Sequence, residues 1–103
     1  MQRLIVMYNL KPGVLMEDYK KYSIEVEQKI VPNLPGIHRF EIFEVKDIEN
    51  KDNPSQIIED IDVESKEAWQ KVLDSDVMKP VGEQWAKYGD ESSVVTIFGE
   101  KIE

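Results

Sequence analysis

The chain has 103 residues, which suits one domain spanning residues 1–103 and little more. Acidic side chains outnumber basic ones by 21 to 13, and the net charge of −8 argues against nucleic acid and anionic membrane as partners. There is no cysteine, which excludes disulfides, thiol nucleophiles and thiolate metal sites. Without a transmembrane-length stretch or a signal-peptide pattern, we expect a cytoplasmic protein.

The first third of the chain predicts a strand followed by a helix. Residues 4–8 form a continuous apolar run rich in β-forming side chains, which is typical of a strand covered on both faces. Turn residues at 9–13 separate this run from a helix expected over residues 16–31, which Pro32 and Pro35-Gly36 end. The helix has one apolar stripe, formed by Leu15, Tyr19, Tyr22, Val26 and Ile30.

The middle of the chain predicts a β-hairpin. Residues 37–45 and 57–63 alternate apolar with polar side chains, and a polar loop over residues 47–55 joins them. If the loop centres near Lys51, Phe40 lies opposite Asp62, Ile42 lies opposite Asp60, and His38 is diagonal to Asp62. One face is then mostly core: Phe43, Val45, Ile57, Ile61 and Val63. The other has the composition of a small-molecule pocket: His38, Phe40, Ile42, Ile58, Asp60 and Asp62.

The last third predicts a second helix, in one or two pieces, and a final strand. Ser65 is a candidate N-cap for a helix whose apolar side is Ala68, Trp69 and Val72. After an interruption at residues 74–76, the stripe resumes with Met78, Val81, Trp85 and Tyr88. Pro80 either kinks this helix or lies in the first turn of a second piece, and Gly89 is a candidate C′ residue. Residues 93–98 form the last predicted strand, which Gly99 ends, and residues 100–103 a loose tail.

The order strand, helix, strand, strand, helix, strand predicts an α+β fold, a ferredoxin-like βαββαβ sandwich. Both helices are expected on one face of an antiparallel sheet. The first and last strands are apolar on both sides, so the face without helices would expose a large apolar patch. We therefore expect a homodimer in which a second sheet covers that face, giving a dimeric α/β barrel. The alternative is a monomer whose tail or long loop covers it.

His38, the only histidine, is the best candidate for a general acid–base residue because its ordinary pKa lies near neutrality. Asp62 or Asp60 is expected to orient it. The alternative interpretation is a surface histidine at the start of a strand, with the two aspartates solvated at an edge or a pocket rim. No multi-histidine site or EF-hand spacing is present, so we expect neither a metal nor a cofactor.

Several aromatic residues are candidates for substrate binding. Tyr and Trp at helical spacing are most often core, yet they also suit a pocket for a flat aromatic ligand. Asn9 and Arg39 lie near strand ends and can donate hydrogen bonds, although Arg39 is expected to pair with a surface acid such as Glu41 or Glu59. The candidate substrate-binding residues are Tyr8, Asn9, Tyr19, Tyr22, Phe40 and Trp85.

Residues 3–13, residues 34–40 and the late helix carrying Trp85 resemble the RedY/HapK-like group associated with prodiginine pigment pathways. The resemblance covers essentially the whole chain, and none of its motifs is a catalytic signature. It implies a ferredoxin-like protomer, a dimer of two sheets, a pocket in each subunit and a role in making the bipyrrole part of a prodigiosin-type pigment.

Three functional hypotheses follow. The first is a cofactor-independent enzyme that binds a flat pyrrolic intermediate, with His38 moving a proton during cyclisation, condensation or aromatisation. The second is a non-catalytic carrier or helper of pathway enzymes, for which His38 is dispensable. The third is a cofactor-free monooxygenase, which would consume oxygen in the presence of substrate.

Overall fold

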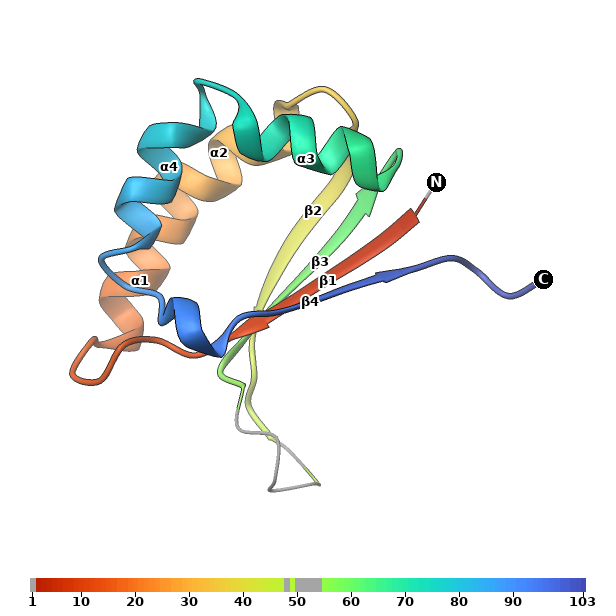
Figure 1. Ribbon diagram of the computed structural model, residues 1–103. Helices are drawn as coiled ribbons and strands as arrows, with labels where there is room; N and C mark the ends of the chain where they lie inside the picture. Colours follow the sequence, from red (N-terminus) through yellow and green to blue (C-terminus); the bar gives the residue numbers. More distant parts are fainter. Residues whose placement is uncertain (1, 48, 50–54) are drawn as a thin grey trace.

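A computed structural model describes residues 2–47, 49 and 55–103 (Figure 1). The expected centre of the hairpin loop at Lys51 lies outside the described residues. The strands are β1 (Gln2–Tyr8), β2 (Ile37–Glu44), β3 (Ile57–Val63) and β4 (Val95–Gly99). The helices are α1 (Met16–Tyr22), η1 (Ser23–Glu27), α2 (Gln28–Ile30), η2 (Val31–Asn33), α3 (Lys66–Asp74), α4 (Met78–Trp85) and η3 (Glu91–Ser93).

The four strands form one antiparallel sheet in the order β2-β3-β1-β4, and the helices lie over one of its faces (Figure 1). The predicted α+β, ferredoxin-like fold is confirmed. Alternation along the strands decides what each face carries, because successive side chains point to opposite sides. Leu4, Val6 and Tyr8 point toward the helices and are buried, whereas Ile5 and Met7 are only half-buried on the other face.

The register predicted for the hairpin was wrong by one residue. Phe40 pairs with Ile61 and Ile42 with Glu59, so Asp60 and Asp62 lie opposite Glu41 and Arg39 instead. A β-bulge at His38, between Ile37 and Arg39, shifts the pairing. A one-residue slip moves every side chain to the opposite face. Phe40 and Ile42 therefore lie on the helix side of the sheet, and Phe43, Ile58, Asp60 and Asp62 on the open side.

The first long helix is not uniform, as Ser23–Glu27 form a π-helical segment between α1 and α2. A wider turn shifts the residues after it around the helix axis. Tyr19 and Tyr22 are buried as the stripe predicted, but Leu15 is 56% exposed and Glu27 is buried. The π-helical turn thus directs a carboxylate toward the core, where a regular α-helical pattern did not place it.

The second helix is split, and both predicted cues take part. The Ser65 hydroxyl accepts a hydrogen bond from the Ala68 amide at 3.0 Å, which confirms it as the N-cap of α3. Helix α3 ends at Asp74, and Pro80 lies in the first turn of α4, where its missing N–H leaves no bond unmade. None of the helices in the described part of the chain combines the length and apolar character that a membrane crossing requires.

Gly89 follows α4, but its role differs from the predicted one. Positive φ angles occur at Gly13 and Gly36 and not at Gly89, so Gly89 is not in the left-handed conformation expected of a C′ glycine. Instead, a Cβ atom added at Gly89 would lie 2.2 Å from Cζ2 of Trp85. Glycine is required here because the backbone passes against the Trp85 ring.

Candidate functional site

A cavity of about 600 Å³ lies between the helix side of the sheet and helices α3 and α4. Its size falls within the usual range of small-molecule sites. Most of its wall is apolar or aromatic: Val6, Val31, Phe40, Trp69, Leu73, Met78, Val81, Gly82, Trp85, Ala86 and Val94. Its remaining lining residues bear polar groups: Tyr8, Glu27, Glu59, Glu91 and Thr96. An apolar cavity with a few converging polar groups is typical of a site for a flat organic ligand.

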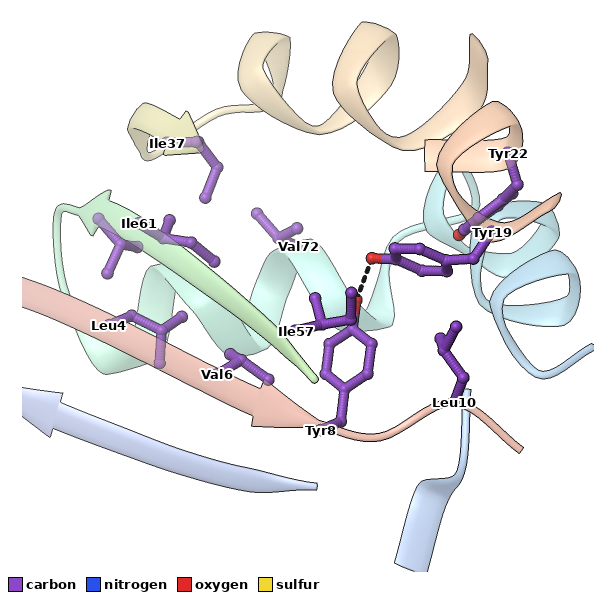
Figure 2. Close-up of a cluster of buried hydrophobic side chains, with 11 residues drawn as sticks. Leu4, Val6, Tyr8, Leu10, Tyr19, Tyr22, Ile37, Ile57, Ile61 and Val72 are labelled. Carbon is purple, nitrogen blue, oxygen red and sulfur yellow. Dashed lines mark hydrogen bonds between the residues drawn. The ribbon is translucent and has the colours of Figure 1, made fainter. Parts of the chain in front are cut away.

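Two buried tyrosines and a buried glutamate form a hydrogen-bonded chain at this wall. The Tyr8 hydroxyl donates to Oε2 of Glu59 at 2.7 Å. The hydroxyls of Tyr8 and Tyr19 lie 2.5 Å apart, which Figure 2 shows as a dashed line in the core. Glu59 lies on β3 beside Val6 of β1, and Tyr8 follows two residues later on the same face. The chain therefore runs from the cavity wall into the space between sheet and α1.

Glu27 supplies a second buried carboxylate. It is 5% exposed, and Glu59 is 7% exposed. Oε1 of Glu27 has no hydrogen-bond partner among the described residues. A buried carboxylate oxygen without a partner is costly, and such atoms are found preferentially where a ligand or a proton completes the site.

Burial raises the pKa of both carboxyl groups. For Glu59 burial is the main cause, the Tyr8 hydrogen bond opposes it, and the pKa rises to about 7. For Glu27 burial comes first and the nearby Glu59 charge second, and its pKa lies well above the usual range. The pKa values of Tyr8, Tyr19 and Tyr22 are also raised, chiefly by burial, so these hydroxyls stay protonated. A carboxyl group with a pKa near neutrality can both give and take a proton at physiological pH.

Aromatic rings shape the cavity around these groups. Trp85 packs edge-to-face on Tyr8, with ring centroids 5.1 Å apart. Tyr19 packs edge-to-face on Tyr8 from the other side at 6.2 Å. These contacts hold Tyr8 in the position from which its hydroxyl reaches Glu59.

The three residues predicted to be catalytic lie elsewhere. His38 is exposed at the β-bulge of β2 and does not line the cavity. Asp60 and Asp62 lie on the open face of the sheet, where Arg39 binds Asp60 at 2.8 Å and Asp62 at 2.9 Å. Arg3 also binds Asp62, at 2.8 Å. The predicted face was wrong because the register was wrong, and the pairing of Arg39 with acids of the open face is confirmed.

The predicted substrate-binding residues divide into two groups. Tyr8, Phe40 and Trp85 line the cavity, and Tyr19 reaches it through Tyr8. Two others have structural partners outside it. Asn9 joins segments, since its amide N–H donates to Ser93 and its side chain accepts from the Gln56 amide. The Tyr22 hydroxyl donates to the Val81 carbonyl at 3.1 Å.

Sequence reasoning missed Glu27 and Glu59. Glu59 lies between Ile57 and Ile61 at the period of a strand's buried face, and that position was the available signal. Glu27 carried no such signal because only the π-helical turn makes it face inward. Within the described residues, no group of three His, Asp or Glu side chains is arranged to hold a metal ion. The expectation of no metal and no cofactor stays a prediction.

The antiparallel sheet, the helix layer and the cavity define a ferredoxin-like α+β protein with an internal small-molecule site. Residues 2–102 match the family described as REDY-like protein HapK, and the chain belongs to this family. No curated protein sequence matches the chain significantly.

Solved structures with the same fold are distant in sequence. HapK from Hahella chejuensis superposes with a TM-score of 0.81 at 16% identity, covering 99% of this chain and 93% of that one. The Arabidopsis thaliana protein At3g17210 gives 0.81 at 18% identity, covering 100% and 97%. A dimeric ferredoxin-like protein from Jannaschia gives 0.76 at 15% identity, covering 97% and 98%. Similarity at this level concerns the fold.

Proposed function

We propose that this protein binds a flat, largely apolar small molecule in the cavity and moves a proton on it without a cofactor. The observation that carries the proposal is the buried Glu59 at the cavity wall, hydrogen-bonded to Tyr8 and with a pKa of about 7. A carboxyl group buried on an apolar wall is a common arrangement of a general acid–base residue.

The geometry supports distinct roles for the neighbouring groups. Ionised Glu59 takes a proton from a carbon or nitrogen of the ligand and, once protonated, returns it to a leaving hydroxyl or to a neighbouring atom. Tyr8 stabilises the ionised form by its 2.7 Å hydrogen bond and is a positioning residue. Phe40, Trp69 and Trp85 offer aromatic surfaces on which a flat ligand can stack.

Membership of the HapK family supports a place in prodigiosin-type pigment biosynthesis, on the bipyrrole branch. The ligand would then be a pyrrolic intermediate, and the reaction a cyclisation, condensation or aromatisation. These steps need proton transfers, which the carboxyl groups supply.

Mass spectrometry of bipyrrole-pathway intermediates incubated with the purified protein tests the proposal. We expect turnover by the wild type, a loss of at least about 100-fold in Glu59→Gln, in line with the typical contribution of a general acid–base group, and little change in His38→Ala. Loss of turnover in His38→Ala but not in Glu59→Gln would instead return catalysis to His38 with Asp60 or Asp62. Binding without turnover would favour the carrier or helper function, and oxygen consumption the monooxygenase.

We also propose that the protein is a homodimer formed through the open face of its sheet. Across the four strands, aligned residues of that face form an apolar row: Phe43, Ile58, Met7 and Val95. Phe43, Val95 and Ile97 are 49%, 48% and 47% exposed. The neighbouring charges of Arg3, Arg39, Asp60 and Asp62 are paired within the chain. A second copy would therefore cover the apolar row without having to neutralise those charges, and the Jannaschia neighbour is described as dimeric.

A further inference from the structure

The cavity wall carries negative charge with no positive partner. Glu27, Glu59 and Glu91 line it, and the described lining residues include no lysine, arginine or histidine. The net charge of the whole chain, −8, has the same sign. An anionic ligand entering this cavity would be repelled, since the low-dielectric wall screens charge poorly.

No packed element supplies a compensating charge to the two buried glutamates. The titratable groups that face them are the phenols of Tyr8 from β1 and of Tyr19 and Tyr22 from α1, which are raised in pKa and neutral. The segment η3 adds a further acid, Glu91. The cavity-lining residues of β2, α3, α4 and β4 are uncharged: Phe40, Trp69, Leu73, Met78, Val81, Gly82, Trp85 and Thr96.

One acceptor in this wall is unfilled. Oε1 of Glu27 is buried and without a hydrogen-bond partner among the described residues, although it belongs to a side chain lining the cavity. A ligand that places an N–H group against this oxygen would satisfy it. The rings of Tyr8 and Trp85, in edge-to-face contact nearby, offer aromatic surface to a flat cation.

We propose that the cavity selects flat ligands that present N–H donors to Glu27 and Glu59 and carry no negative charge, with protonated nitrogen heterocycles bound most tightly. This inference rests on the proposed function in using the same cavity, but it concerns binding and not turnover. Carboxylated, phosphorylated or coenzyme A-linked forms of the ligand are rejected for the same electrostatic reason.

Binding of a cation is expected to release protons. In the empty site burial favours the protonated form of both glutamates, and the pKa of Glu59 is about 7. A cationic ligand stabilises the ionised form, so it replaces a proton when it binds. Its affinity should therefore rise as pH increases from about 5.5 to about 8, while that of a neutral ligand of the same shape should not rise.

Isothermal titration calorimetry with three two-ring probes tests the proposal. The probes are 4-aminoquinoline, a flat N–H cation over this pH range, 1-aminonaphthalene, its neutral counterpart, and 1-naphthoate, an anion. At about pH 7.5 we expect the cation to bind at least about tenfold more tightly than the neutral probe, and the anion at least about tenfold more weakly. Titrations in buffers of different ionisation enthalpy should show proton release with the cation alone.

Two conservative variants locate the effect. Glu27→Gln should reduce the preference for the cation to about threefold or less, because the amide keeps the volume but not the charge. Glu25→Gln is the control, since Glu25 lies in the same π-helical segment and is exposed. If Glu27→Gln fails to fold, the order of the three probes and the proton release of the wild type still decide.

The outcomes separate this inference from the proposed function. Equal binding of 1-naphthoate and 1-aminonaphthalene, or cation binding without proton release, would overturn the inference and leave catalysis open to test. Selective cation binding by a protein that turns over no pathway intermediate would support the inference and count against the enzyme. Failure of all three probes to bind would overturn the inference and remove the cavity as a ligand site.

Discussion

The Tyr8 hydroxyl lies 2.7 Å from Oε2 of Glu59, and this hydrogen bond joins two strands at the wall of the cavity. Glu59 reaches the core only because Tyr8 offers it a donor there. Unpaired, a carboxyl group this deeply buried would destabilise the fold. The bond therefore has a structural role as well as a role in setting the pKa of Glu59.

Tyr8→Phe should raise the pKa of Glu59 further above its value of about 7, because the Tyr8 hydrogen bond lowers it. The substitution should also destabilise the fold by about 1–3 kcal/mol, since it leaves Oε2 of Glu59 without its donor. Carboxyl ¹³C NMR titration measures the first effect and urea denaturation the second. Tyr22→Phe, which removes a bond to the Val81 carbonyl, is the control and should leave the Glu59 titration nearly unchanged. A pKa of Glu59 that falls in Tyr8→Phe would contradict the assigned role of the hydroxyl.

Stability should decrease with rising pH through the titration of Glu59. Its pKa is raised from 4.5 to about 7 in the folded state, so the folded protein binds the proton more tightly than the unfolded chain. The stabilisation is therefore fully present below about pH 4.5, falls as pH rises and is lost above about pH 7, a change on the order of 3 kcal/mol.

Glu59→Gln should flatten this slope, and Glu27 contributes in the same direction because its pKa is also raised. Asp62 acts oppositely, as Arg39 first, and Arg3 with it, lower its pKa, so its contribution is lost in acid below the window used here. Urea denaturation at several pH values between about 5 and 7.5 measures the slope. A wild-type stability that rises with pH across this interval would rule out a buried protonated Glu59.

Two glycine substitutions near α4 should have opposite effects. Gly89→Ala places a Cβ atom against the Trp85 ring, at 2.2 Å from Cζ2, so the ring must move and the cavity must change shape. We expect destabilisation by about 1–3 kcal/mol, as for other overpacking changes, and a shifted tryptophan fluorescence spectrum. Gly82→Ala is the control, since nothing lies within 4 Å of its added Cβ and it is helical. It should stabilise by about 0.5–1 kcal/mol, and similar melting temperatures for the two variants would contradict the predicted clash.

Substitutions on the open face should change the oligomeric state. Ile97→Lys puts a charge into the apolar surface beside Ile5, so we expect the proposed dimer to dissociate into monomers. Light scattering across micromolar concentrations measures this. Ile24→Lys, at a position 59% exposed on the helical side, should leave the dimer intact. A wild type that is monomeric throughout this range would remove the dimer proposal.

Local patterns in the sequence were enough for most of the fold. The order of elements, the N-cap at Ser65, the break after Asp74 and the apolar stripe containing Tyr19 and Tyr22 are all confirmed. These features depend on contacts between residues close in sequence, or on an alternation that strand geometry enforces.

What only the tertiary structure decided is which polar side chains meet. The β-bulge at His38 sets the hairpin register, and with it the open-face position of Asp60 and Asp62. The π-helical turn at Ser23–Glu27 directs Glu27 inward. Because each device adds or removes a fraction of a turn or one residue of register, it reverses the face that a side chain occupies without changing the pattern of residue types. The site built from Glu27, Glu59 and Tyr8 therefore follows from packing between distant segments and not from a motif.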